Sequence, residues 1–265
     1  EYSYSINEIL NAEQTSNLEK GKIYFETAID KTEISNYLES INKNIDQFQD
    51  SMICYITSNN LFAFYIKNES IIPVDVITVT GKMIKFFFKD ESSRYEEMNK
   101  RTEQMFGTAT VSILQKLKVG VVGVSGTGSI VAEQMVRLGI GEIVLVDNDV
   151  IEEKNLNRIL NSKRHDAANN ISKVEMFEQH IKMSELPTNV ITCNTVVACR
   201  ETIKELSQCD VIFGCLDSID GRHHLNLIST CYSIPYFDVG VKLVADGIGG
   251  IDEVTTAAHY IQPGE

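Results

Sequence analysis

From residue 118 onward the sequence alternates short apolar runs with amphipathic stretches, and this alternation constrains the fold more than any other feature of the chain. The apolar runs predict strands at 118–122, 142–147, 190–197, 211–214 and 236–241. The amphipathic stretches predict helices at 129–138, 173–181, 201–206 and 222–232. Strands that alternate with helices form βαβ units, in which the strands lie parallel in one sheet. We therefore predict an α/β fold with a Rossmann-like, doubly wound and mainly parallel sheet.

The first 90 residues have a different pattern, which predicts a small N-terminal α+β domain. Short β-rich runs lie at 23–25, 52–57, 62–66, 71–79 and 83–88. Between the first two runs, Ile34, Leu38 and Ile41 recur at helical spacing and predict one amphipathic helix. Residues 1–90 contain no pattern that indicates chemistry, and we interpret them as an accessory or docking domain.

The remaining chain divides into a connector and a larger domain. Residues 91–118 are charged and have a mostly helical pattern, which predicts a helical connector. Residues 119–265 contain the strand–helix alternation and are expected to form the functional domain. We expect this domain to be truncated at its C-terminus.

The composition excludes several classes of function. The chain is 23% charged and carries a net charge of −13, whereas nucleic-acid binding requires a basic surface. No apolar run approaches the length that spans a bilayer, and no signal-peptide pattern opens the chain. None of the six cysteines forms a C-x-x-C pair, so zinc is not supported within residues 1–265. We expect a cytoplasmic protein with reduced thiols that binds neither nucleic acid nor membrane.

A glycine-rich turn follows the strand predicted at 118–122. Gly123, Ser125, Gly126 and Gly128 lie in this turn, and a predicted helix follows directly. Glycines permit a tight turn and close approach of the backbone to phosphate, and the helix that follows supplies free N–H groups and a positive dipole end. The spacing is G-x-x-G-x-G, which differs from the dinucleotide pattern G-x-G-x-x-G, and no Walker-type Gly-Lys-Ser/Thr follows. The turn therefore predicts a nucleotide site.

The next predicted strand ends at Asp147, and acidic residues at this position commonly accept hydrogen bonds from ribose hydroxyls. A NAD-dependent oxidoreductase with a Rossmann domain would account for the pattern up to this point. It would leave unexplained the polar residues that follow.

Those residues are Asp149, Asn155 and Arg158, then Lys173, and then Asp217 after the strand predicted at 211–214. From about residue 94 to the end, the sequence resembles the ThiF/MoeB/HesA-type adenylyltransferases of the ubiquitin-activating-enzyme superfamily. Members of that family carry a glycine-rich turn, D-x-D, N-x-x-R, a lysine and a later aspartate in this order.

The resemblance implies ATP-dependent adenylation of the C-terminal carboxylate of a ubiquitin-like or sulfur-carrier protein, with release of pyrophosphate. It implies that the glycine-rich turn, Asp147, Asp149 and Asn155 bind ATP, with Asp147 on the ribose. It further implies that Arg158 and Lys173 neutralise phosphate charge in catalysis and that Asp217 binds Mg²⁺.

One residue upstream of the turn is implied to act on a neighbouring subunit. Arg101 stands six residues before Gly107, and relatives have an Arg-Gln pair at this spacing whose arginine reaches the triphosphate bound by the neighbouring subunit. Thr102 replaces the glutamine here, and Arg94 with Tyr95 is an alternative anchor for the same motif. The resemblance therefore implies a homodimer with shared active sites.

The resemblance also has limits. Many relatives carry two C-x-x-C pairs that bind zinc, and some carry a catalytic cysteine. In this chain, residues 260–264 resemble the stretch that directly precedes the first C-x-x-C pair of those relatives. Whether a catalytic cysteine or zinc site lies beyond residue 265 stays open, as do the carrier protein, the acceptor after adenylation and the role of the N-terminal domain. The alternatives to adenylation are a NAD-dependent oxidoreductase and a non-catalytic, adenylation-like partner subunit.

Overall fold

A computed structural model gives the fold and describes residues 22–28, 31–58, 60–89 and 97–263. Contacts between residues divide the chain into two compact units, residues 1–79 with 85–91 and residues 80–84 with 92–265. Each unit has a sheet of its own and a hydrophobic core of its own.

The second unit is built on a six-stranded sheet in the order β12-β11-β10-β7-β8-β9. Its strands are β7 (Lys118–Val122), β8 (Glu142–Val146), β9 (Asn189–Cys193), β10 (Val211–Gly214), β11 (Tyr236–Ala245) and β12 (Ile251–Ile261). The strands β7 to β11 pair in parallel, and β12 pairs antiparallel with β11. The Rossmann-like, mainly parallel sheet predicted from the strand–helix alternation is confirmed.

The chain reverses its direction across this sheet at β7. From β7 it adds β8 and β9 on one side, and it then returns to add β10 and β11 on the other side. Ligands of open parallel sheets bind outside the carboxyl ends of the strands where such a reversal occurs. This position lies beyond Val122 and Gly214, the paired last residues of β7 and β10.

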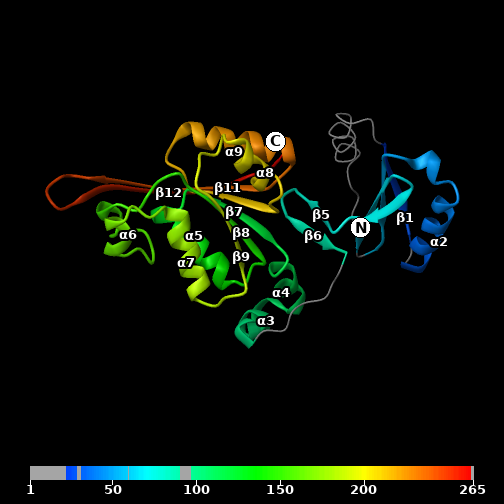
Figure 1. Cartoon of the computed structure of the whole chain (residues 1–265), viewed down its shortest axis with the longest axis horizontal. Coiled ribbons are helices and arrows are strands. Elements are labelled where there is room, and N and C mark those ends of the chain that lie inside the picture. The colour runs from blue at the N-terminus through cyan, green and yellow to red at the C-terminus, as the bar shows by residue number, and fades with distance from the viewer. Residues whose placement is uncertain (1–21, 29–30, 59, 90–96, 264–265) are drawn as a thin grey trace. The chain divides into compact units, whose positions relative to one another are not determined.

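Helices cover both faces of the sheet, with α8 and α9 on one face and α5 and α7 on the other (Figure 1). The helices of this unit are α3 (Lys100–Phe106), α4 (Thr108–Leu114), α5 (Gly126–Arg137), α6 (Arg164–Ala168), α7 (Lys173–Met183), α8 (Arg200–Leu206) and α9 (Ile219–Tyr232), with 3₁₀ turns η2 (Glu97–Asn99) and η3 (Glu153–Asn155). In a search of the described residues, no helix proved long and apolar enough to cross a membrane.

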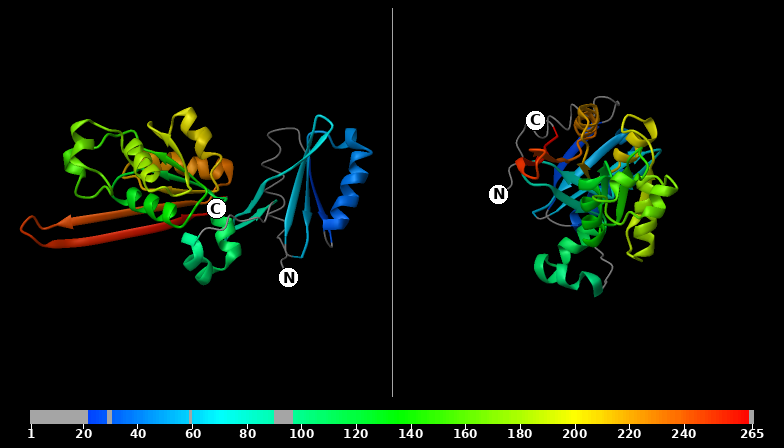
Figure 2. Two further views of the ribbon diagram at one scale, coloured as in Figure 1. Left: turned by 60° about the horizontal axis from the view of Figure 1, so that its bottom comes forward. Right: turned by 90° about the vertical axis from the view of Figure 1, so that its left-hand side faces the viewer.

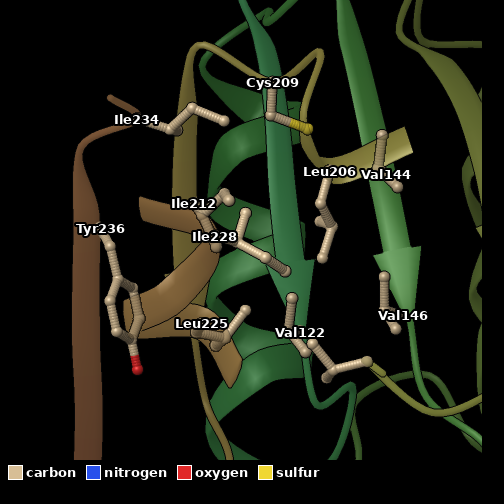
Figure 3. Packing of buried hydrophobic residues seen from close by; sticks show 11 residues of the cluster. Val122, Val144, Val146, Leu206, Cys209, Ile212, Leu225, Ile228, Ile234 and Tyr236 are labelled. Carbon is tan, nitrogen blue, oxygen red and sulfur yellow. The ribbon is translucent and has the colours of Figure 1, made fainter. Parts of the chain in front are cut away.

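One hydrophobic core of this unit lies between the sheet and the α8–α9 layer (Figure 3). Val122, Val144 and Ile212 from the strands pack there against Leu225 and Ile228 of α9. Strand side chains alternate between faces, so the intervening residues of β7 and β8 point toward α5 and α7, and these residues are also buried. Because these strands are buried on both faces, nearly every residue in them is apolar, and they form almost continuous apolar runs in the sequence.

The hairpin of β11 and β12 was not predicted. The strand expected at 236–241 continues to Ala245, past Asp238, which pairs with Gly214 of β10. β12 pairs with β11 along its length, and the hairpin extends beyond the helices that cover the sheet (Figures 1 and 2). Several of its large apolar side chains are more than half exposed: Val241, Leu243, Ile248, Ile251 and Val254.

The first unit contains a four-stranded sheet in the order β1-β2-β3-β4 and a separate β5–β6 hairpin. Its elements are β1 (Lys22–Thr27), α2 (Lys31–Asn42), η1 (Ile45–Phe48), β2 (Ser51–Ile56), β3 (Leu61–Lys67), β4 (Ser70–Pro73), β5 (Val76–Val79) and β6 (Lys85–Phe88). β1 and β2 are parallel and are connected through α2, whose Ile34 packs in the core with Ile53, Tyr55 and Ile66. The strand expected at 71–79 divides in two after Pro73, which has no N–H to continue a ladder.

Candidate functional site

The glycine-rich turn lies at the reversal point of the sheet, and at two of its glycines the backbone packs too closely to admit a side chain. Gly123 follows β7 with a φ of +88°, and a Cβ built on it would lie 2.7 Å from the carbonyl oxygen of Cys215. A Cβ built on Gly128 would lie 1.7 Å from the carbonyl oxygen of Gly123. Both positions therefore require glycine, and the turn is packed against the loop that follows β10.

The helix α5 begins inside this turn, at Gly126 rather than at the expected residue 129. Ser125 is the N-cap residue, and its side chain makes no capping hydrogen bond. The first N–H groups of a helix have no partner within the helix, so the beginning of α5 offers donors and the positive end of the helix dipole to an anion.

Arg158 lies beside the beginning of α5. A Cβ built on Gly126 would lie 3.3 Å from the Cδ atom of Arg158, so glycine leaves room for this side chain. The exposed guanidinium donates from Nη1 to the carbonyl oxygen of Lys154 at 2.9 Å. Arg158 therefore adds a positive charge to the same end of the helix.

Asn155 supports the turn that carries Arg158. Its buried side-chain Oδ1 accepts a hydrogen bond of 2.9 Å from the N–H of Glu152. The N–H of Arg158 donates in turn to the carbonyl oxygen of Asn155 at 3.0 Å. Asn155 thus shapes the backbone that presents Arg158.

Asp147 follows β8 and accepts hydrogen bonds from the protein itself. Its Oδ2 accepts from the N–H of Val124 at 2.8 Å, and its Oδ1 accepts from the N–H of Asp149 at 2.9 Å. The Nζ of Lys173 lies 3.4 Å from the same Oδ1, and only 8% of the Asp147 side chain is exposed. Asp147 therefore fixes the glycine-rich turn to the end of β8.

Lys173 begins α7 and carries a buried charge. Its side chain is 6% exposed, and its Nζ lies 2.7 Å from Oδ2 of Asp149, whose own side chain is 64% exposed. Its N–H donates to the carbonyl oxygen of Asp149 at 3.0 Å. The two carboxylates of Asp147 and Asp149 offset the cost of burying this ammonium group.

Asp217 has the opposite environment. It lies in the loop after β10 and is exposed, and in the part of the chain that the structure describes no donor lies within hydrogen-bond distance of its carboxylate. The next residue, Ser218, caps α9 by accepting a hydrogen bond of 3.2 Å from the N–H of Gly221. The loop therefore presents a carboxylate that is open to a cation.

The structure also contains a group that the sequence analysis missed. Arg222 of α9 donates from Nε and Nη2 to the carbonyl oxygen of Leu216, at 3.0 and 2.9 Å. Its Nη1 lies 3.1 Å from Oδ2 of Asp238 on β11, and Tyr236 donates to the other oxygen of Asp238 at 3.1 Å. The sequence signal was a cationic residue one turn into the helix after Asp217, which a helical pattern alone does not distinguish from a surface charge.

Cys215 precedes Asp217 in this loop and is a poor nucleophile. Burial, with a further contribution from the charge of Asp238, raises the pKa of the Cys215 thiol to about 12. A thiol with such a pKa stays protonated near neutral pH, and the thiolate is the reactive form.

Arg101 lies apart from these residues within the chain. It is exposed on α3, which packs against α4 and η2. α4 precedes β7 and contacts Gly141, which precedes β8, so this layer lies at the amino ends of the parallel strands. The structure thus brings together the turn, Asp147, Asp149, Arg158 and Lys173 at the carboxyl edge, and it places Arg101 at the opposite edge.

The sequence profile of the ThiF family matches residues 99–250, which is more than half of the chain. The protein belongs to the ThiF family. The matched residues include the glycine-rich turn and all the other predicted site residues, from Arg101 to Asp217. The family resemblance inferred from these residues is therefore confirmed.

The curated relatives of the chain include proteins named as activating enzymes. Over 164 residues the chain is 27% identical to ubiquitin-like modifier-activating enzyme 5 of Aedes aegypti and 31% identical to that of Xenopus laevis. Each match covers 57% of this chain and 38% of the relative. SUMO-activating enzyme subunit 2 of Dictyostelium discoideum is 26% identical over 162 residues, which cover 60% of this chain and 24% of that protein. This ThiF-family chain therefore spans much less than the full length of these relatives.

Solved structures share the fold. E. coli MccB with succinimide has a TM-score of 0.53 and 21% identity, and the match covers 64% of this chain and 50% of that chain. E. coli MccB with ATP has a TM-score of 0.52 and 21% identity over the same shares. At this identity the likeness establishes the fold of the ThiF-family unit.

Proposed function

We propose that this ThiF-family protein uses ATP and Mg²⁺ to adenylate the C-terminal carboxylate of a ubiquitin-like or sulfur-carrier protein, releasing pyrophosphate. The observation that carries this proposal is the convergence of charges at one edge of the sheet. The beginning of α5, the buried Lys173 and the open carboxylate of Asp217 follow neighbouring strands at the reversal point.

The cationic groups suit a triphosphate. A carboxylate that attacks the α-phosphate of ATP is itself anionic, so positioning and charge neutralisation must supply most of the rate. The free N–H groups at the start of α5 and the guanidinium of Arg158 would bind phosphate oxygens. Lys173, which Asp147 and Asp149 hold in place, would supply a further positive charge.

Asp147 and Asp149 are the candidates for binding the ribose of ATP. The protein's own donors occupy much of the Asp147 carboxylate, which has about four acceptor positions. Asp149 is far more exposed and follows two residues later. We propose that Asp147 uses its remaining acceptor capacity together with Asp149 to bind the ribose hydroxyls.

The residues fit magnesium that arrives with ATP. Among the described residues, no group of three or more His, Cys, Asp or Glu could hold a metal ion. Mg²⁺ is commonly bound by one or two carboxylates together with substrate phosphates, and the exposed carboxylate of Asp217 suits that arrangement. When bound, the ion would neutralise charge on the phosphates.

The carrier protein is inferred from the names of the relatives, and the assembly is inferred from the family resemblance at Arg101. Relatives of the matched segment are named as activating enzymes for ubiquitin-like modifiers and as a subunit of a SUMO-activating enzyme. We propose a homodimer in which Arg101, at the amino edge of its own sheet, contributes to the site of the neighbouring subunit. We place the reaction in the cytoplasm.

The rival functions leave site residues without a role. A NAD-dependent oxidoreductase would use the turn and Asp147 and would have no use for the open carboxylate of Asp217 or for the buried Lys173. A non-catalytic partner subunit would not need Arg158, Lys173 and Asp217 together. The adenylation proposal gives each of them a task.

The test is exchange of labelled pyrophosphate into ATP in the presence of a candidate ubiquitin-like protein. We expect exchange by the unaltered protein, and we expect none with a carrier that lacks its C-terminal residue. Asp217→Ala should abolish exchange, whereas Asp220→Ala, a change at another exposed aspartate in the first turn of α9, should retain it.

Normal exchange by Asp217→Ala would show that the magnesium assignment is wrong. Turnover of a nicotinamide cofactor without exchange would support the oxidoreductase instead.

A further inference from the structure

Arg222 connects the loop that carries Asp217 to the beginning of β11. Its Nε and Nη2 both donate to the carbonyl oxygen of Leu216, the residue directly before Asp217. Its Nη1 contacts Oδ2 of Asp238 at 3.1 Å. One guanidinium therefore joins α9, the loop after β10 and the neighbouring strand.

The β11 end of this connection is firmly held. Asp238 is buried, and its other oxygen accepts a hydrogen bond from Tyr236, which lies in the core (Figure 3). A buried carboxylate needs a compensating charge, and Arg222 supplies it. Gly240 leaves space for the guanidinium, because a Cβ built there would lie 3.0 Å from Nη2. Losing the arginine would leave Asp238 with Tyr236 as its remaining partner among these contacts.

The loop end is held from two sides. The N–H of Cys215 donates to the carbonyl oxygen of Val122, the last residue of β7, at 2.7 Å. The side chain of Leu216 lies against the glycine-rich turn, since a Cβ built on Gly123 would lie 3.1 Å from its Cδ2. Arg222 fixes the carbonyl of the same residue. The backbone that leads into Asp217 is thus fixed relative to the turn.

We propose that Arg222 is a positioning residue that holds the carboxylate of Asp217 where it meets magnesium-bound ATP. The inference rests on the proposed function for the identity of the ligand. The planar guanidinium reaches one carbonyl with two donors while a third contacts Asp238, and a lysine ammonium group cannot reproduce that fork. Arg222 does not contact the reacting atoms and acts through the loop.

The first measurement needs no ligand. Hydrogen exchange of the backbone amides of residues 214–222 should speed up by about fivefold to tenfold in Arg222→Lys, as expected when one or two hydrogen bonds that hold a segment are lost. Asp238→Asn should have a similar effect, because it removes the charge that holds the guanidinium. The matched control is Arg137→Lys, which alters an ion pair with Glu133 on α5 and should leave these amides unchanged.

The second measurement is calorimetric binding of ATP with and without MgCl₂. Arg222→Lys should reduce the gain in ATP affinity that magnesium gives by about 10-fold to 100-fold, the usual effect of removing a group that orients a metal ligand. ATP binding without magnesium should stay unchanged. The double variant with Asp217→Asn should bind no more weakly than Asp217→Asn alone, because both changes act on one interaction.

The outcomes separate the two proposals. Unchanged amide exchange in Arg222→Lys, additive losses in the double variant, or an unaltered protein whose ATP affinity does not depend on magnesium would each overturn the role of Arg222. If ATP binding follows the expected pattern but no carrier protein supports pyrophosphate exchange, the adenylation proposal fails and the role of Arg222 stands.

Discussion

Asp147 and Asp217 follow the two strands that flank β7, yet the structure gives them opposite environments. The carboxylate of Asp147 is buried and accepts hydrogen bonds from the backbone of Val124 and Asp149. The carboxylate of Asp217 is exposed, and its loop is held instead through the neighbouring carbonyl by Arg222. One aspartate therefore organises the site, and the other is left open to a ligand. Substitutions on the two sides of this contrast should therefore differ in the folding free energy that they cost.

The largest loss of stability is expected in the glycine-rich turn, which contacts both Asp147 and the loop that carries Asp217. Gly128→Ala would force the turn open, because the new Cβ would lie 1.7 Å from the carbonyl oxygen of Gly123. We expect a loss of about 3 kcal/mol or more in the free energy of unfolding, at the upper end for overpacked sites, together with loss of ATP binding.

Urea unfolding and calorimetry measure both effects of this change. Gly81→Ala is the control, because its Cβ would meet nothing closer than 3.9 Å and should change stability by less than about 1 kcal/mol. Equal stability of the two variants would contradict the packing described for the turn.

Asp147→Ala should destabilise the protein by about 2 to 3 kcal/mol, because the N–H of Val124 loses its acceptor and the buried Lys173 loses one of its carboxylates. Asp147→Asn keeps an oxygen for that N–H and should lose less. Urea unfolding distinguishes the two changes. If Asp147→Ala left the free energy of unfolding unchanged, Asp147 would not organise the site and would resemble Asp217 in its small contribution to stability.

Asp217→Ala should leave the free energy of unfolding within about 0.5 kcal/mol of the original, as is usual for exposed positions. Pyrophosphate exchange should nevertheless be lost. Unfolding curves and exchange assays on the same preparation provide the comparison with Asp147→Ala. A large loss of stability would mean that Asp217 also holds the fold together.

Cysteine alkylation tests the Asp217 loop without a substitution and without a change in stability. At about pH 8, an ordinary cysteine is partly thiolate, but burial raises the pKa of Cys215 to about 12, so the folded protein should alkylate at the exposed Cys231 and spare Cys215. Cys215 should react once urea removes its burial. Mass spectrometry of iodoacetamide-treated protein shows which cysteines are alkylated. Rapid labelling of Cys215 in the native state would show that the Asp217 loop is not held as described.

The sheet could be predicted because its strands are buried on both faces and therefore read as apolar runs. The hairpin could not be predicted, because residues 251–261 mix acidic, small and polar side chains without regular alternation and depend on β11 for their pairing. α5 begins before the expected residue because glycines at the turn have low intrinsic helix propensity and are helical through tertiary packing.

The order of the candidate residues along the chain predicts that the turn, Asp147 and Asp217 lie at one edge of the sheet, since the carboxyl ends of parallel strands meet there. Their environments could not be found in this way. Nothing in the sequence says that Asp147 is buried and Asp217 exposed, since each follows a strand. The contact between Arg222 and Asp238 joins residues on a helix and a strand, and it depends on tertiary geometry that periodicity does not encode.

The β11–β12 hairpin has a consequence for the behaviour of the protein in solution. β12 is the last strand of its sheet, and Leu243 and Val254 face each other across the hairpin with both side chains exposed. An edge strand that exposes apolar side chains of this kind is a template for intermolecular pairing, which charge repulsion between copies opposes. The net charge of −13 supplies that repulsion near neutral pH. As acid protonates the carboxylates, we expect colloidal stability to fail before the fold does, with self-association beginning at the hairpin.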